Sequence, residues 1–140
     1  MNTIEIVEST LINPDSEAIL NYERLDLDAL LDDCMGQKDL LMELMRRYRN
    51  DVLTFIGITR SALTVQDYTV LLSATRDIMN GLTMMQTSSL RGIVILLHNI
   101  SRTNGDLKYF EFLFQCFIEE FESVQKDMDM KLKQLSVLKR

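Results

Sequence analysis

The sequence predicts an all-α protein, an antiparallel helical bundle that forms one domain. The only proline, Pro14, lies near the start, so the strongest helix breaker is missing from residues 15–140. The chain has nine methionines and few runs of β-branched residues, which favours helix over strand. A hydrophobic fraction of 46% in 140 residues is enough for one core and is short for two.

Composition and charge exclude several classes of protein. A formal net charge of −6 argues against a general binder of nucleic acid or anionic membranes. No apolar run approaches the roughly 18 residues that span a bilayer, and the N-terminus lacks the basic flank and apolar core of a signal peptide. Two cysteines, Cys34 and Cys116, are too few for a disulfide framework and fit a reducing cytosol. With His98 as the single histidine, neither a classical zinc site nor a Ser-His-Asp hydrolase is expected. We expect a cytoplasmic protein without a metal or cofactor.

Residues 1–24 are expected to form an N-terminal arm with one short helix. Asn13-Pro14-Asp15 is typical of a turn. Asp15 or Ser16 can cap a short helix that runs to about Tyr22, because either side chain can accept a hydrogen bond from a helix N-terminus.

Residues 25–140 are expected to form the bundle, which opens with a helix from Leu27 to Cys34. Asp26 stands at its N-cap position, and Gly36 fits the left-handed residue that often follows a helix. Apolar residues at three- and four-residue steps then predict four longer helices. Their expected ranges are about 38–63, 67–85, from a cap at Thr87 or Ser88 to 102, and 107–135 or beyond.

The helix over 67–85 has an unusual outer side. Its core side is expected to hold Tyr68, Leu71, Leu72, Thr75, Ile78, Met79, Leu82 and Met85. The outer side carries Asp77, with Val70, Ser73, Asn80, Gly81 and Met84 around it. A glycine inside an exposed helix costs about 1 kcal/mol relative to alanine. Gly81 therefore either clears space for the backbone of another molecule, or packs against a neighbouring helix, or reflects neutral drift.

Two segments, Leu25–Leu31 and Gly36–Leu41, followed by the long helix, resemble the opening of a histidine-containing phosphotransfer (HPt) domain. Such domains carry a His-x-x-Lys-Gly motif in the middle of a bundle helix. Here Asp77 stands at the position of the histidine, Asn80 at that of the lysine and Gly81 at that of the glycine. The resemblance covers about residues 25–130 and implies a four-helix core with an additional short N-terminal helix.

The two substitutions bear directly on chemistry. In the family, the histidine accepts a phosphoryl group and passes it to a receiver-domain aspartate, while the lysine neutralises phosphate charge. The resemblance therefore implies a degenerate, non-catalytic member (a pseudo-HPt domain) that modulates a response regulator or histidine kinase of a bacterial two-component phosphorelay by binding it. We expect the partner to be a receiver domain, a sensor kinase or another regulatory protein. The expected binding residues are Val70, Ser73, Asp77, Gly81 and Met84.

Neither remaining candidate phosphoacceptor is expected to serve. His98 lacks the lysine and glycine that follow the family histidine, and a boundary histidine hydrogen-bonded to a neighbour or to water is the expected role. Asp77 has no second carboxylate spaced to build a magnesium-binding pocket with it. Because a receiver's own pocket is acidic, Asp77 would repel it, and contact should be mainly apolar or use another face.

Other interpretations stay open. The small, acidic, methionine-rich chain also fits a helical chaperone or a regulatory component of a secretion system. Arg46, Arg47 and Arg49 form either a solvated basic face or a docking patch for an acidic partner. Apolar positions beyond Met128 in the last helix allow a homodimer without requiring one.

Overall fold

The structure is a computed structural model that describes residues 26–138, with side chains described through residue 134. Its helices are α3 (Leu27–Asp33), α4 (Lys38–Val65), α5 (Tyr68–Met84), α6 (Ser88–Arg102) and α7 (Leu107–Leu138). No strand occurs within these residues, so the prediction of an all-α bundle is confirmed. The predicted arm and short helix of residues 1–24 lie outside the described residues.

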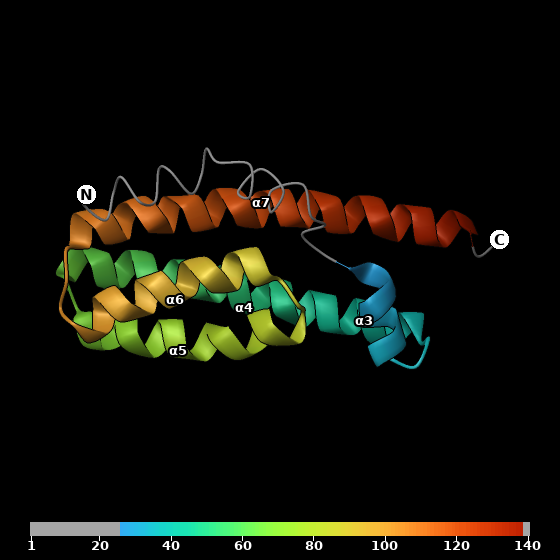
Figure 1. Ribbon diagram of the computed structural model, residues 1–140, viewed down its shortest axis with the longest axis horizontal. Helices are drawn as coiled ribbons and strands as arrows, with labels where there is room; N and C mark the ends of the chain where they lie inside the picture. The colour runs from blue at the N-terminus through green and yellow to red at the C-terminus, as the bar shows by residue number, and fades with distance from the viewer. Residues whose placement is uncertain (1–25, 139–140) are drawn as a thin grey trace, which may run out of the picture.

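The four long helices, α4 to α7, alternate in direction, so that each is antiparallel to the one before it (Figure 1). Short links make successive helices neighbours, so α4 packs against α5, α5 against α6 and α6 against α7. The shorter α5 and α6 lie beside the C-terminal half of α4, while α3 packs near the start of α4 at the other end of the molecule. No described helix is both long enough and apolar enough to cross a membrane.

Aromatic side chains of α4 and α7 fill the centre of the core. Phe55 meets Phe117 edge to face, with ring centroids 5.1 Å apart, and meets Phe114 in the same way at 6.2 Å. Tyr48 and Phe121 form a similar pair at 6.2 Å. Edge-to-face pairs of this kind are favourable beyond the area they bury. The apolar stripes that define the helices in the sequence therefore also define the core.

The ends of the helices lie within a few residues of the expected positions. The side chains of Asp26 and Asp67 accept hydrogen bonds from the backbone N–H groups of Ala29 (3.0 Å) and Val70 (3.1 Å), as N-caps do. Thr87 precedes α6, but its hydroxyl donates to the Leu82 carbonyl (3.2 Å) instead of capping the helix. Thr87, one of the two residues predicted to cap this helix, is therefore its N-cap residue, but it makes no side-chain cap because its hydroxyl is bonded to the carbonyl near the end of α5.

The turn after α3 also differs from expectation. Met35, not glycine, is the first left-handed residue after the helix, with φ 55°, and Gly36 follows it with φ 75°. The Gly36 N–H donates to the Leu31 carbonyl (2.8 Å) and closes the helix end. Met35 and Gly36 both adopt the left-handed conformation, which the sequence predicted for Gly36 alone.

Replacing Gly92 with alanine is expected to raise the free energy of unfolding by about 0.5–1 kcal/mol, which urea denaturation measures. Gly92 is exposed inside α6, and an added Cβ would meet nothing within 4 Å. Gly105→Ala is the contrasting control, since its Cβ would lie 3.2 Å from Ile100 Cγ2 outside any helix. Equal stabilisation by both substitutions would contradict helix propensity as the cause.

Candidate functional site between α4 and α5

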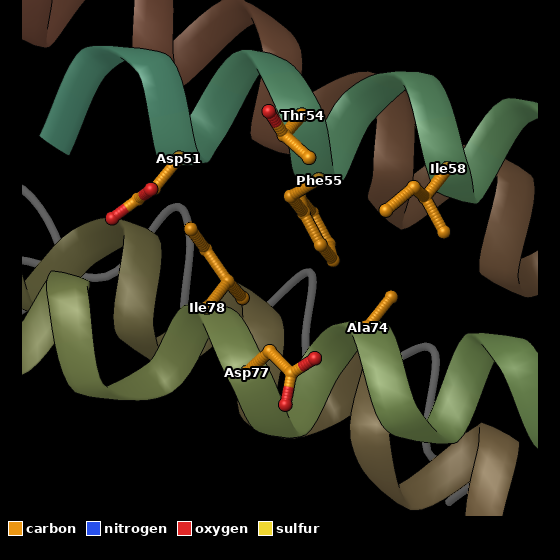
Figure 2. A pocket seen from close by; sticks show the side chains of 7 residues that line it. All are labelled: Asp51, Thr54, Phe55, Ile58, Ala74, Asp77 and Ile78. Carbon is orange, nitrogen blue, oxygen red and sulfur yellow. The ribbon is translucent and has the colours of Figure 1, made fainter. Parts of the chain in front are cut away.

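A groove follows the seam between α4 and α5 on the surface of the bundle. It consists of two hollows of about 220 and 350 Å³ that share Ile58, and we call it the α4–α5 groove. The first hollow is lined by Asp51, Thr54, Phe55, Ile58, Ala74, Asp77 and Ile78 (Figure 2). The second is lined by Gly57, Ile58, Ser61, Ala62, Val65, Asp67 and Val70.

The groove follows from residue spacing on two antiparallel helices. Asp51, Ile58 and Val65 recur every seven residues on α4, so they lie along one line of that helix. Val70 and Asp77 have the same spacing on α5. Two lines of side chains therefore face outward on either side of the seam, and buried Phe55 and Ile78 lie beneath them.

Two carboxylates, Asp51 and Asp77, line the first hollow from opposite helices (Figure 2). Both side chains are exposed, and neither forms a hydrogen bond or ion pair with the described residues. The docking of α4 on α5 places Asp51 on the opposite wall of the hollow that Asp77 lines, which the sequence did not predict. No group of three or more potential metal-ligating side chains occurs within the described part of the chain, so the pair stands without a third ligand.

Gly81 lies half-buried beside the Asp51 carboxylate. A Cβ built on Gly81 would lie 3.9 Å from Asp51 Oδ2, which is ordinary van der Waals contact. Alanine would therefore fit here, and close packing within the bundle does not require glycine. Of the three explanations for Gly81, clearance for another molecule and neutral drift are the two that this geometry leaves.

Of the remaining predicted site residues, one lines the groove and the others lie on the exposed surface of α5 next to it. Val70, 37% exposed, lines the second hollow, whereas Ser73 and Asn80 are exposed on α5 without lining either hollow. Met84 is exposed one turn beyond Gly81 and also stands outside the hollows. The structure thus brings Val70 and Asp77 into one groove and leaves the other residues on the surface next to it.

Sequence reasoning missed the contribution of α4. Asp51, Thr54 and Ile58 all line the groove, and Ile58 is 43% exposed. The seven-residue spacing from Asp51 to Ile58 and Val65 is visible in the sequence. It runs beside the stronger apolar stripe of the same helix, which takes the core-facing side and hides the signal.

His98 is held by the neighbouring helix, as expected for a boundary residue. Its Nδ1 lies 2.9 Å from the hydroxyl of Thr75, a fully buried residue of α5. The same hydroxyl lies 2.9 Å from the Leu72 carbonyl, to which it can donate. His98 is half-buried and lines neither hollow of the groove.

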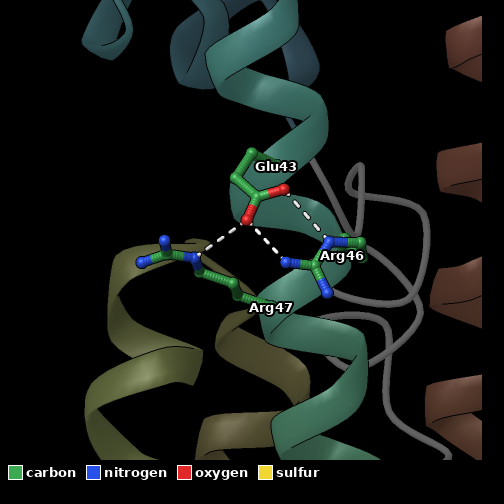
Figure 3. A network of polar contacts seen from close by, with 3 residues as sticks. All are labelled: Glu43, Arg46 and Arg47. Carbon is green, nitrogen blue, oxygen red and sulfur yellow. Dashed lines mark hydrogen bonds and ion pairs between the residues drawn. The ribbon is translucent and has the colours of Figure 1, made fainter.

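The arginine cluster on α4 is partly neutralised by its own helix (Figure 3). The Glu43 carboxylate accepts hydrogen bonds from Arg46 (2.6 Å) and from Arg47 (3.2 Å). All three side chains are well exposed to solvent, so these ion pairs contribute little to stability. This pairing favours a solvated face over a docking patch for an acidic partner.

The Glu43 carboxyl is expected to titrate far below an ordinary glutamate. Hydrogen bonds from Arg46 and then Arg47 lower the pKa of Glu43 from 4.5 to about 2. The folded-state pKa is depressed, so the contribution of this carboxylate to stability is present above about pH 4.5 and is lost as the pH falls toward 2. Carboxyl-detected NMR titration measures the midpoint directly. The paired Arg46→Ala, Arg47→Ala variant should return it toward 4.5, and a wild-type midpoint near 4.5 would contradict the arrangement.

Comparisons with known proteins add no family to these observations. No protein-family model, curated protein or solved structure matches the chain. The resemblance to HPt domains therefore rests on the segments 25–31 and 36–41, on the order of the helices, and on Asp77, Asn80 and Gly81. These three positions lie together in the second half of α5, with Asp77 and Asn80 exposed.

Proposed function

We propose that the chain is a non-catalytic interaction module of two-component signalling, which binds a response regulator or histidine kinase through the α4–α5 groove. One observation carries the proposal: Asp77, at the position of the family histidine, is exposed at a groove with an apolar floor. A partner that docks on an HPt domain would meet this surface, because the motif helix α5 forms one wall of it.

The chemistry of the groove supports binding without phosphoryl transfer. The imidazole nucleophile and the lysine of the motif are replaced by Asp77 and Asn80. Asp51 adds a second negative charge to the hollow. Two carboxylates repel a phosphoryl group, so its arrival at Asp77 would need a compensating cation that the described residues do not provide there.

Exposed apolar side chains supply the attraction. Val65 is 70% exposed, and Ile58 and Val70 are also open to solvent along the groove. Burying apolar surface contributes about 25 cal/mol per Å², so three such side chains at the centre of an interface contribute substantially. A chain bound in this way would compete with a true phosphotransfer protein for the same partner surface.

The test is a phosphotransfer assay with a radiolabelled, phosphorylated receiver domain. We expect the wild-type chain to take no label and to slow transfer from the receiver to an active phosphotransfer protein. The double variant Asp77→His, Asn80→Lys restores the His-x-x-Lys-Gly motif and is expected to accept label, because it returns an imidazole nucleophile and a cation to exposed positions of α5.

The matched control introduces His98→Ala into the wild-type chain and into the double variant. Label on the wild-type chain that survives Asp77→Ala and disappears with His98→Ala would replace the proposal with phosphotransfer through His98. No label on the double variant, together with no competition by the wild type, would exclude receivers as partners. Label uptake and competition are then measured with a kinase domain in place of the receiver, which tests the histidine kinase as the partner.

A further inference from the structure

The α4–α5 groove combines an acidic end with an apolar length. Asp51 and Asp77 give one end two exposed carboxylates with no hydrogen bond or ion pair among the described residues. Ile58 lies at the middle, where the two hollows meet, and Val65 and Val70 line the other end. A partner that fills the groove must therefore bring positive charge to one end and apolar side chains to the rest.

The length of the groove along α4 corresponds to a helix of about four turns. At 1.5 Å per residue, Ile58 lies about 10 Å along α4 from Asp51, and Val65 lies about 21 Å from it. The walls are themselves two antiparallel helices, and an apolar groove between helices is a common seat for an amphipathic helix. A helix aligned with α4 would present residues to these points at seven-residue intervals.

We propose that the α4–α5 groove binds a partner helix that carries lysine or arginine at one position and apolar residues seven and fourteen positions away. The cation would lie at the end of the groove that Asp51 and Asp77 line from opposite walls, and the apolar residues would cover Ile58 and then Val65 and Val70. The proposal rests on the proposed function, since it uses the same groove, and it adds the chemistry of the partner. An acidic phosphorylation pocket is disfavoured as the contacting surface, because it would meet the two carboxylates.

Gly81 contributes to this chemistry by leaving the Asp51 carboxylate open. The site of its missing side chain is 3.9 Å from Asp51 Oδ2, so a long side chain here would lie against that carboxylate. A lysine or arginine from the partner can approach Asp51 from this side. Packing within the bundle does not require glycine at position 81, whereas in the complex its missing side chain would leave room for the partner's cation.

The experiment is selection from a displayed library of 20-residue amphipathic helices, in which one face is randomised. The wild-type chain is expected to enrich lysine or arginine at one position, with apolar residues seven and fourteen positions away. The Asp51→Asn, Asp77→Asn double variant should lose that enrichment and bind the selected helices about tenfold more weakly. Asp32→Asn, Asp39→Asn is the matched control, because it makes the same change of charge at exposed positions outside the groove and should behave as wild type.

The outcomes separate this inference from the proposed function. Selection of uncharged apolar helices, equal enrichment on both double variants, or selection of no helix would each overturn the inference. If uncharged helices are selected and compete with a receiver or kinase, the cation preference is wrong while the proposed function stands. If cationic helices are selected but compete with neither protein, the partner chemistry is supported and two-component signalling is removed as its setting.

Discussion

Replacing Phe117 with alanine is expected to lower the free energy of unfolding by about 3–5 kcal/mol. The Phe117 side chain is fully buried in α7 and meets Phe55 edge to face at 5.1 Å. Truncation removes this contact and leaves a cavity that the surrounding helices fill only in part. Because Phe55 also lines the first hollow of the α4–α5 groove, the loss should loosen the wall of the candidate site.

Urea denaturation of the purified variant measures the effect, and Phe112→Ala provides the control on the same helix. Phe112 is 62% exposed, so its truncation should change the free energy of unfolding by no more than about 0.5 kcal/mol. Equal losses at the two positions would mean that the buried face of α7 has been assigned wrongly.

Replacing Gly81 with arginine is expected to abolish partner binding while the bundle stays folded. The Cβ fits beside Asp51 at 3.9 Å, so the start of the new side chain needs no shift of the backbone. The rest of it would extend over the first hollow, next to Asp77. At the centre of an interface, a blocked contact of this kind costs about 2 kcal/mol or more, which is roughly a thirtyfold increase in Kd.

Titration calorimetry with the proposed partner, a receiver or kinase domain, measures the change, and circular dichroism checks that the helices persist. Gly92→Arg carries the same side chain on α6, where it is exposed and would meet nothing within 4 Å at its Cβ. It should bind as wild type does. Unchanged affinity in Gly81→Arg would remove the α4–α5 groove as the docking surface.

Local sequence determined the helices and most of their ends. Three- and four-residue spacing fixes which side of a helix is apolar, so the core face of α5 and the exposure of Asp77 follow from the sequence alone. The caps Asp26 and Asp67 were equally predictable, because each acts on a backbone N–H three residues later. Where a side chain had a choice of partner, as Thr87 did, the sequence did not decide it.

Tertiary structure decided what stands across from the motif positions. Asp51 lies beside Gly81 and shares a hollow with Asp77 only because α4 and α5 dock in one register, and a slip of one turn would place another residue in the hollow. The hydrogen bond between Thr75 and His98 depends in the same way on how α5 meets α6. Periodicity gives the face that each helix presents and says nothing about its displacement along a neighbour. Side-chain packing sets that displacement, and it turned an isolated surface aspartate into one of two carboxylates at an apolar groove.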